Sequence, residues 1–164
     1  MLGKSCVVYF SASGATEKVA TTLAMGIGSD LYKIQPVEPY TKKDLNWLNP
    51  RSRSSVEMKN KSYRPEMTIA LESVEKYDYI FVGFPIWWYV APTIVNTFLE
   101  KFDLTGKHVI PFATSGSSGM GNTCAELAPS CPGAILHEGK RFKKKASVQE
   151  LVEWAEDETQ RLDK

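Results

Sequence analysis

The chain has 164 residues, of which 43% are hydrophobic and 24% charged, which is typical of one soluble domain, here residues 1–164. The 20 Lys+Arg residues nearly balance the 19 Asp+Glu residues, and a net charge of +1 argues against a nucleic-acid partner. Three cysteines are too few for a disulfide scaffold and indicate a cytoplasmic protein, and the longest charge-free apolar stretch, 79–95, is too short for a membrane span.

Strand and helix patterns alternate from the start of the chain. The apolar run 6–10 predicts a buried strand, and apolar residues at helical spacing over 16–27 predict a helix that ends before Gly28. Residues 31–34 alternate in polarity and predict a second strand. The segment 36–64 shows no sustained period, so we expect a long ordered loop, a feature that is often functional.

The alternation continues through the second half. Apolar residues over 69–74 predict a short helix, and 79–84 carries the strongest strand pattern. The remaining expectations are a helix over 93–102, a strand over 107–113, a helical segment through Cys124 and Leu127, a short strand over 134–136, a solvated basic loop over 140–145 and a helix over 148–162. Such alternation predicts an α/β fold, with a parallel sheet covered by helices on both faces.

Three loops of unusual composition, 11–16, 85–89 and 114–121, each follow a predicted strand. In doubly wound sheets, ligands bind beyond the carboxyl ends of the strands, where the strand order reverses. We therefore expect the three loops to form a single ligand site.

The first loop, Ser-Ala-Ser-Gly-Ala-Thr at 11–16, joins a strand to a helix. Its backbone N–H groups can converge on an anion, and the helix N-terminus adds roughly half a positive charge. The hydroxyls of Ser11, Ser13 and Thr16 can add hydrogen bonds. The loop has no Lys or Arg, which favours a phosphate that a cofactor retains over one that is transferred. The alternative is that these residues only cap the helix.

Other phosphate-binding motifs are absent from this position. The loop has no Gly-Lys pair before Ser or Thr, as a nucleoside triphosphatase loop requires, and it has one glycine where a dinucleotide fingerprint has three. A small tyrosine phosphatase needs arginine six residues after its cysteine, and alanine follows Cys6 at that spacing. These three classes are excluded.

The second loop, Pro85-Ile86-Trp87-Trp88-Tyr89, contains three consecutive aromatic residues. Successive loop residues cannot all face one core, so we expect at least one ring to be exposed or to contact a ligand. Indole rings offer flat surfaces that can stack on a planar heterocycle. The alternative is that Trp87 or Trp88 packs beneath the following helix, and we expect this of one of the two.

The third loop, 114–121, combines four hydroxyl residues with three glycines. Glycines permit close backbone approach and leave N–H groups free to point at a flat polar edge. The alternative is a merely flexible loop, which is less favoured because the segment directly follows a predicted strand.

Together these pieces resemble the flavodoxin superfamily. The Ser-x-Ser-Gly-x-Thr loop is similar to its phosphate loop, Gly83–Tyr89 is similar to its Gly-x-Pro-x-Trp loop, and Ser115–Gly119 is similar to its second flavin loop. The resemblance extends from Lys4 to the last helix. It implies a five-stranded flavodoxin-like sheet in the order 2-1-3-4-5 and noncovalently bound flavin mononucleotide (FMN).

The resemblance also implies a role for each loop. Loop 11–16 would hold the phosphate, Trp87 would lie against the isoalloxazine ring, and the backbone of 115–119 would bind its pyrimidine edge. The residues so assigned are Ser11, Ser13, Gly14, Ala15, Thr16, Pro85, Ile86, Trp87, Trp88, Tyr89, Ser115, Gly116, Ser117 and Gly119. The resemblance implies no catalytic side chain, because the redox chemistry belongs to the flavin.

The implied function is electron transfer between redox partner proteins, a reductase and an acceptor. One alternative is an FMN-dependent NAD(P)H:quinone-type oxidoreductase with a small quinone-type acceptor. Another is a binding module that has lost the flavin. The near-neutral charge differs from the acidic character usual among electron-carrying flavodoxins. The two histidines and three cysteines match no zinc-binding spacing, so we expect no metal.

Overall fold

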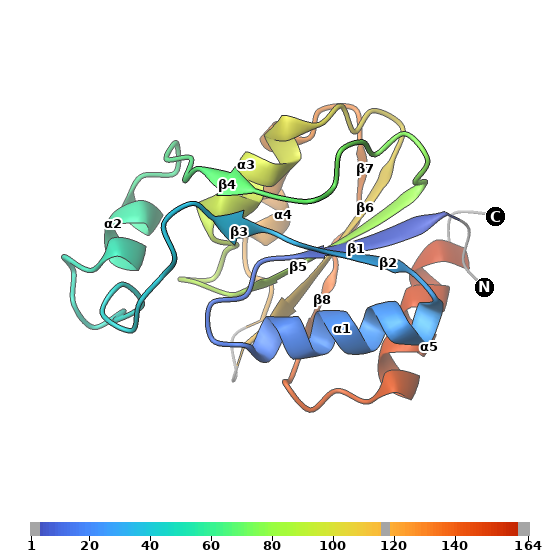
Figure 1. The fold of residues 1–164 in the computed structure, drawn as a ribbon, viewed down its shortest axis with the longest axis horizontal. Helices are drawn as coiled ribbons and strands as arrows, with labels where there is room; N and C mark the ends of the chain where they lie inside the picture. Colours follow the sequence, from blue (N-terminus) through green and yellow to red (C-terminus); the bar gives the residue numbers. More distant parts are fainter. Residues whose placement is uncertain (1–3, 116–118, 161–164) are drawn as a thin grey trace.

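A computed structural model describes residues 4–115 and 119–160 of the chain (Figure 1). Strands and helices alternate as the sequence predicts. In chain order the elements are β1 (Ser5–Tyr9), α1 (Ala15–Ile27), β2 (Asp30–Lys33), β3 (Gln35–Pro36), α2 (Arg53–Lys59), β4 (Met67–Thr68), β5 (Tyr79–Pro85), α3 (Thr93–Lys101), β6 (His108–Thr114), α4 (Thr123–Leu127), a 3₁₀ turn (Ala128–Ser130), β7 (Ile135–Leu136), β8 (Lys140–Phe142) and α5 (Val148–Gln160).

The main sheet is parallel, with strand order β2-β1-β5-β6-β7. Counted as the five sheet positions in chain order, this is the expected order 2-1-3-4-5, and the expectation is confirmed. The fifth position is divided between two short strands, β7 and β8, which both pair with β6, so the sheet has six strands. The short strands β3 and β4 form a separate antiparallel pair.

The break between β7 and β8 lies opposite Pro111 in the middle of β6. The strand β7 pairs with the beginning of β6 and β8 with its end, and Pro111 has no N–H to donate between them. A Cβ atom at Gly139 would lie 2.2 Å from the Pro111 carbonyl oxygen, so only glycine fits there. The expected solvated loop over 140–145 is therefore wrong at its start: Lys140–Phe142 is a strand, and Phe142 is buried.

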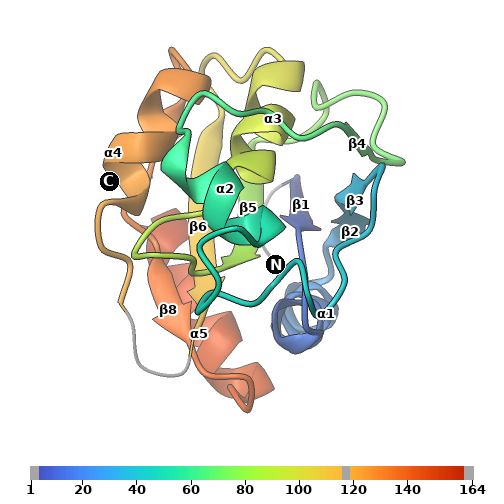
Figure 2. The same cartoon turned by 90° about the vertical axis from the view of Figure 1, so that its left-hand side faces the viewer.

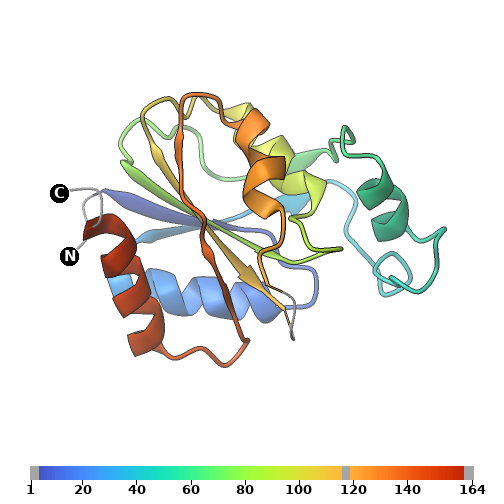
Figure 3. The same cartoon turned by 180° about the vertical axis from the view of Figure 1, so that it is seen from behind.

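Helices cover both faces of the sheet because strand side chains alternate in direction. Val7 and Tyr9 of β1 pack in the core beneath α1 and α5, whereas Cys6 and Val8 pack in the core beneath α3. Figure 1 shows α1 and α5 on one side of the sheet with α3 and α4 on the other, and Figure 3 shows the same layers from behind. No described helix has the length and apolar character needed to cross a membrane.

The segment between β2 and β5 departs most from expectation. The short helix expected over 69–74 is absent: these residues are not helical, and Leu71 and Val74 are buried in the core. The segment 36–64, expected to be a loop, contains the helix α2, whose first turn is capped by the Ser52 side chain, which accepts a hydrogen bond from the Ser55 amide. The buried residues of α2 are Ser54, Ser55 and Glu57, so no apolar period marks this helix.

Candidate functional site

The three unusual loops meet at the carboxyl end of the sheet, as expected. The Ile86 amide donates to the Thr114 carbonyl oxygen at 3.1 Å, which joins the second loop to the start of the third. The hydroxyls of Thr16 and Thr114 lie 2.7 Å apart, which joins the first loop to the third. The Asn122 amide donates to the Tyr89 carbonyl oxygen at 3.2 Å. Figure 2 looks onto this edge, with α2 in front of the end of β5.

The first loop presents the N-terminus of α1. Gly14 caps the helix with a φ of 96°, and a Cβ atom built there would meet no heavy atom within 4 Å. The Ser11 hydroxyl oxygen accepts hydrogen bonds from the amides of Gly14 at 3.1 Å and Glu17 at 3.2 Å. Ser11 therefore caps the helix, which was the alternative to phosphate binding in the sequence analysis. Because the first-turn amides of a helix lack intrahelical acceptors, the loop is a donor-rich, open cradle for an anion.

One carboxylate lies close to this cradle. The Glu17 side chain accepts a hydrogen bond from the Tyr9 hydroxyl at 2.9 Å, and the Lys33 ammonium lies 3.5 Å from the same oxygen. Burial, followed by the hydrogen bond to Glu17, raises the pKa of Tyr9 to about 12, so Tyr9 remains a donor at neutral pH. The negative charge of Glu17 is thus directed toward these two partners, which is compatible with a phosphate in the loop.

Thr16 has a structural contact that the sequence did not indicate. Its side chain is buried, and its hydroxyl is paired with Thr114, 98 residues away in the chain. The side chain of Thr16 therefore fastens α1 to the end of β6. Its backbone N–H, in the first turn of α1, is the group that can face an anion.

The Thr16–Thr114 pair can be tested by a double-mutant cycle. We expect Thr114→Val to lower the free energy of unfolding by about 1–3 kcal/mol, because it leaves a buried hydroxyl without a partner. The double variant Thr16→Val/Thr114→Val should recover much of this loss, since both polar groups are removed at nearly constant volume. Urea denaturation of the four proteins measures the coupling. Additive losses would show that the two hydroxyls do not interact.

The aromatic loop separates its three rings as expected. Trp87 is half-buried and makes edge-to-face contacts with Phe10, at 5.8 Å between ring centroids, and with Tyr40, at 5.5 Å. Trp88 and Tyr89 are 43% and 67% exposed. Pro85 and Ile86 are half-buried at the start of the loop. One tryptophan is therefore packed, and the next two rings remain at the surface.

The backbone at Trp88 and Tyr89 is strained. Their φ values are 49° and 67°, and Trp87 and Val90 exchange hydrogen bonds of 2.9 and 3.1 Å on either side of them. This is the backbone of a tight two-residue hairpin turn, which normally carries Asn-Gly. Left-handed backbone costs a non-glycine residue about 1–2 kcal/mol. Strain of this kind is concentrated at functional sites, where surrounding structure holds it in place.

The third loop helps to hold this turn. Gly121 has a φ of 54°, and a Cβ atom there would lie 2.3 Å from the Tyr89 carbonyl oxygen, so a larger residue would push the two loops apart. Ser115 is half-buried, and its carbonyl oxygen lies 3.5 Å from Nη1 of Arg141. Gly119 is exposed with open space around it. The two remaining assigned residues, Gly116 and Ser117, lie outside the described part of the chain.

A partly buried polar cluster beside Trp87 was missed by the sequence analysis. The Tyr40 hydroxyl donates to Glu57 at 2.6 Å, Nε of Arg53 donates to the same carboxylate at 3.1 Å, and the guanidinium lies 3.8 Å from the centre of the Tyr40 ring. Burial raises the pKa of Tyr40, so its hydroxyl stays protonated. The cluster ties α2 to the loops of the site. No periodic signal marks Tyr40, which follows Pro39 in an irregular segment.

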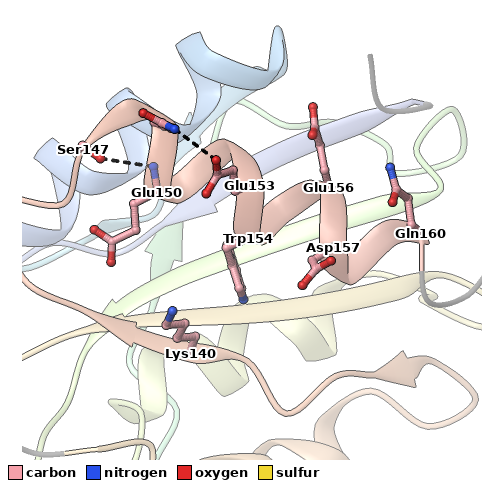
Figure 4. Close-up of a pocket in the computed structure, with 9 residues that line it drawn as sticks. Lys140, Ser147, Glu150, Glu153, Trp154, Glu156, Asp157 and Gln160 are labelled. Atoms are coloured by element: carbon pink, nitrogen blue, oxygen red, sulfur yellow. Dashed lines mark hydrogen bonds between the residues drawn. The ribbon is translucent and has the colours of Figure 1, made fainter.

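Two hollows lie near the sheet, one beside the first loop and one along α5. One of about 280 Å³ adjoins the first loop, and its lining residues are Phe10, Ser11, Ala12, Lys33, Gln35, Pro36, Pro39 and Tyr40. Another of about 670 Å³ runs along α5, lined in part by Glu150, Glu153 and Asp157 (Figure 4). In Figure 4 Trp154 points from α5 toward the sheet, near Lys140. The α5 hollow contains no residue of the three loops, so it is not part of this site.

The comparisons with known proteins agree with this fold. The family model described as flavodoxin matches residues 4–158, and the chain therefore belongs to the flavodoxin family. A candidate flavoprotein from Bacteroides eggerthii is 43% identical, with a TM-score of 0.88 over 95% of this chain and 98% of that chain. A candidate flavoprotein from Bacteroides uniformis is 44% identical, with a TM-score of 0.87 over 95% and 99%.

A more distant structure shares the fold. It is a flavoprotein from Lactobacillus acidophilus in complex with FMN, 19% identical, with a TM-score of 0.68 over 94% of this chain and 99% of that chain. The comparison with curated proteins found no match.

Proposed function

We propose that this protein binds FMN noncovalently and transfers electrons between protein partners. The observation that carries the proposal is the meeting of an anion cradle and an aromatic turn at one edge of the sheet, fastened through Thr114. Membership of the flavodoxin family supports it, as does the FMN complex of the Lactobacillus relative. The flavin supplies the redox chemistry, and the protein binds, orients and shields it.

The residues present fit the phosphate of FMN. The loop offers first-turn amides, the hydroxyls of Ser11 and Ser13, and open space beside Gly14. The loop has no Lys or Arg, which favours a phosphate that a cofactor retains over one that is transferred. In this proposal the amides of 13–16 hold the phosphate, and binding replaces the contacts that the Ser11 oxygen now makes.

The residues around the aromatic turn fit a flat ring system. Trp87 is held by Phe10 and Tyr40, so its position does not depend on the ligand. The exposed Trp88 and Tyr89 extend the apolar surface beyond it. In this proposal Trp87 lies against the ring, Pro85 and Ile86 shape the base of the site, and the backbone of 115–119 binds the polar edge of the ring.

Absorption and activity measurements test the proposal. The freshly purified protein should be yellow, or should take up added FMN with a stoichiometry of one per chain. It should oxidise NADH or NADPH only when a separate flavodoxin reductase is added. Rapid oxidation of either nucleotide by the protein alone, with a quinone as acceptor, would instead identify an oxidoreductase. A colourless protein that does not bind FMN would identify a binding module.

A further inference from the structure

A separate hollow lies where Trp88 meets the segment before and within α2. Its volume is about 270 Å³, and its lining residues are Trp47, Leu48, Pro50, Ser55, Met58, Lys59 and Trp88. Of these residues, only Trp88 is among those assigned to FMN. The hollow therefore adjoins the proposed cofactor site through one shared indole and is otherwise built from the segment 47–59.

The wall opposite Trp88 is held in place by polar contacts. The Ser55 hydroxyl donates to the Asn49 carbonyl oxygen at 2.8 Å, and the Ser54 amide donates to the Asp44 carbonyl oxygen at 2.8 Å. The buried Glu57 carboxylate accepts hydrogen bonds from Tyr40, which precedes the segment, and from Arg53 within α2. These contacts connect α2 to the turn before it, so the hollow is formed without a ligand.

Large apolar side chains remain exposed around this hollow. Trp47 is 68% exposed, Leu48 is 72% exposed and Trp88 is 43% exposed. Exposed apolar residues that gather around a concavity indicate a binding surface. The strained backbone at Trp88 supports the same conclusion, because it holds the indole at the surface where an ordinary turn residue would suffice.

A cation lies at the edge of this apolar surface. Nζ of Lys59 lies 3.5 Å from the Pro50 carbonyl oxygen, at the outer limit of a hydrogen bond. Within residues 4–115 and 119–160, no carboxylate forms an ion pair with Lys59. The surrounding segment 36–66 has seven Lys or Arg residues and four Asp or Glu residues. The charge of the hollow is therefore complementary to an anion.

We propose that this hollow binds a small planar aromatic carboxylate, with its ring on the indoles of Trp47 and Trp88 and its carboxylate paired with Lys59. Small-molecule pockets span about 300–1,000 Å³, and this hollow of about 270 Å³ lies just below the lower end of that range, so it suits a ligand of only one or two fused rings. Indoles favour a flat aromatic ring over a saturated one of the same size. The proposal concerns a site beside the cofactor and does not require that FMN be bound.

Calorimetric titration with 2-naphthoate tests this site, with the neutral 2-naphthamide as the matched ligand. We expect Trp47→Ala to lower the affinity for both ligands about tenfold, since it removes one aromatic wall. We expect Lys59→Gln to lower the affinity for 2-naphthoate about tenfold and to leave that for 2-naphthamide unchanged. Met25→Ala, on the exposed face of α1, and Lys144→Gln, in an exposed loop, are control variants and should bind both ligands like the wild type.

The same titrations separate this proposal from its alternatives. Unchanged binding in Trp47→Ala, or equal losses of both ligands in Lys59→Gln, would overturn it. Displacement of bound FMN by 2-naphthoate would show that the hollow is part of the cofactor site. Concentration-dependent dimerisation that Trp47→Ala abolishes, without naphthoate binding, would assign the surface to a second copy of the chain. Failure to bind FMN with naphthoate binding intact would contradict the proposed function alone.

Discussion

Aspartate in place of Ser13 should lower the affinity for FMN on the order of 100-fold without destabilising the protein. Ser13 is exposed, two residues before α1 begins. A carboxylate there would face the phosphate dianion at close range, and the repulsion amounts to about 2–4 kcal/mol at an effective dielectric constant between those of water and protein. The same charge is favourable near a helix N-terminus, so the free energy of unfolding should be unchanged or higher by about 0.5 kcal/mol.

Three controls make this prediction specific. Riboflavin lacks the phosphate, so its affinity should be the same in Ser13→Asp and in the wild type. Ser13→Asn has a similar shape without the charge and should retain most of the affinity for FMN. The loss in Ser13→Asp should shrink at high ionic strength, because salt screens exposed charges. Fluorescence titration measures the affinities of the wild type and the two variants for FMN and riboflavin, at low and at high ionic strength. Wild-type FMN affinity in Ser13→Asp would show that the phosphate does not bind in this loop.

Alanine in place of Gly83 should lower the free energy of unfolding by about 1–3 kcal/mol. Gly83 lies in β5, and a Cβ atom there would be 2.3 Å from Cζ of Phe112 on the neighbouring strand. Phe112 is fully buried and contacts Trp154, with ring centroids 6.3 Å apart, so its ring has little freedom to move. For a chain of this length the loss corresponds to a melting temperature lower by roughly 2–12 °C.

A second substitution tests the cause. Phe112→Leu removes the ring atoms that the new Cβ would meet, and alone it should destabilise the protein because it leaves a cavity. In the Gly83→Ala background it should cost less than in the wild type, which gives a favourable coupling in a double-mutant cycle. Gly119→Ala is the control, since open space surrounds that position, and it should be nearly neutral. Additive losses at 83 and 112 would contradict the steric explanation.

The elements that the sequence predicted well are those whose burial is carried by apolar side chains. The run 6–10 and the spacing over 16–27 match β1 and α1 because both are packed within the core. The helix α2 was missed because Ser54, Ser55 and Glu57 are its buried residues, and hydrogen bonds rather than apolar contacts hold it. The expected helix over 69–74 is absent for the opposite reason: Leu71 and Val74 are buried in the core, but the segment that carries them is not helical.

The position of the site was predictable, and its internal contacts were not. Parallel strands bring their carboxyl ends to one edge, so the order of the elements already places the three loops together. Which hydroxyls remain available depends on partners distant in the chain, as the pairing of Thr16 with Thr114 shows. The left-handed backbone at Trp88 is likewise unexpected, because bulky residues disfavour it and the neighbouring loop at Gly121 helps to hold it.

By itself, the sequence determined the α/β class, the strand order implied by the family resemblance, and the composition of the loops at the edge of the sheet. These follow from local patterns of polarity and from small, hydroxyl and aromatic residues in short motifs. Only the tertiary structure decided that Tyr40, Glu57 and Arg53 form a partly buried cluster beside Trp87, and that α2 and the turn before it line a further hollow with Trp88. The physical reason is that such contacts join segments far apart in the chain, and no local period encodes them.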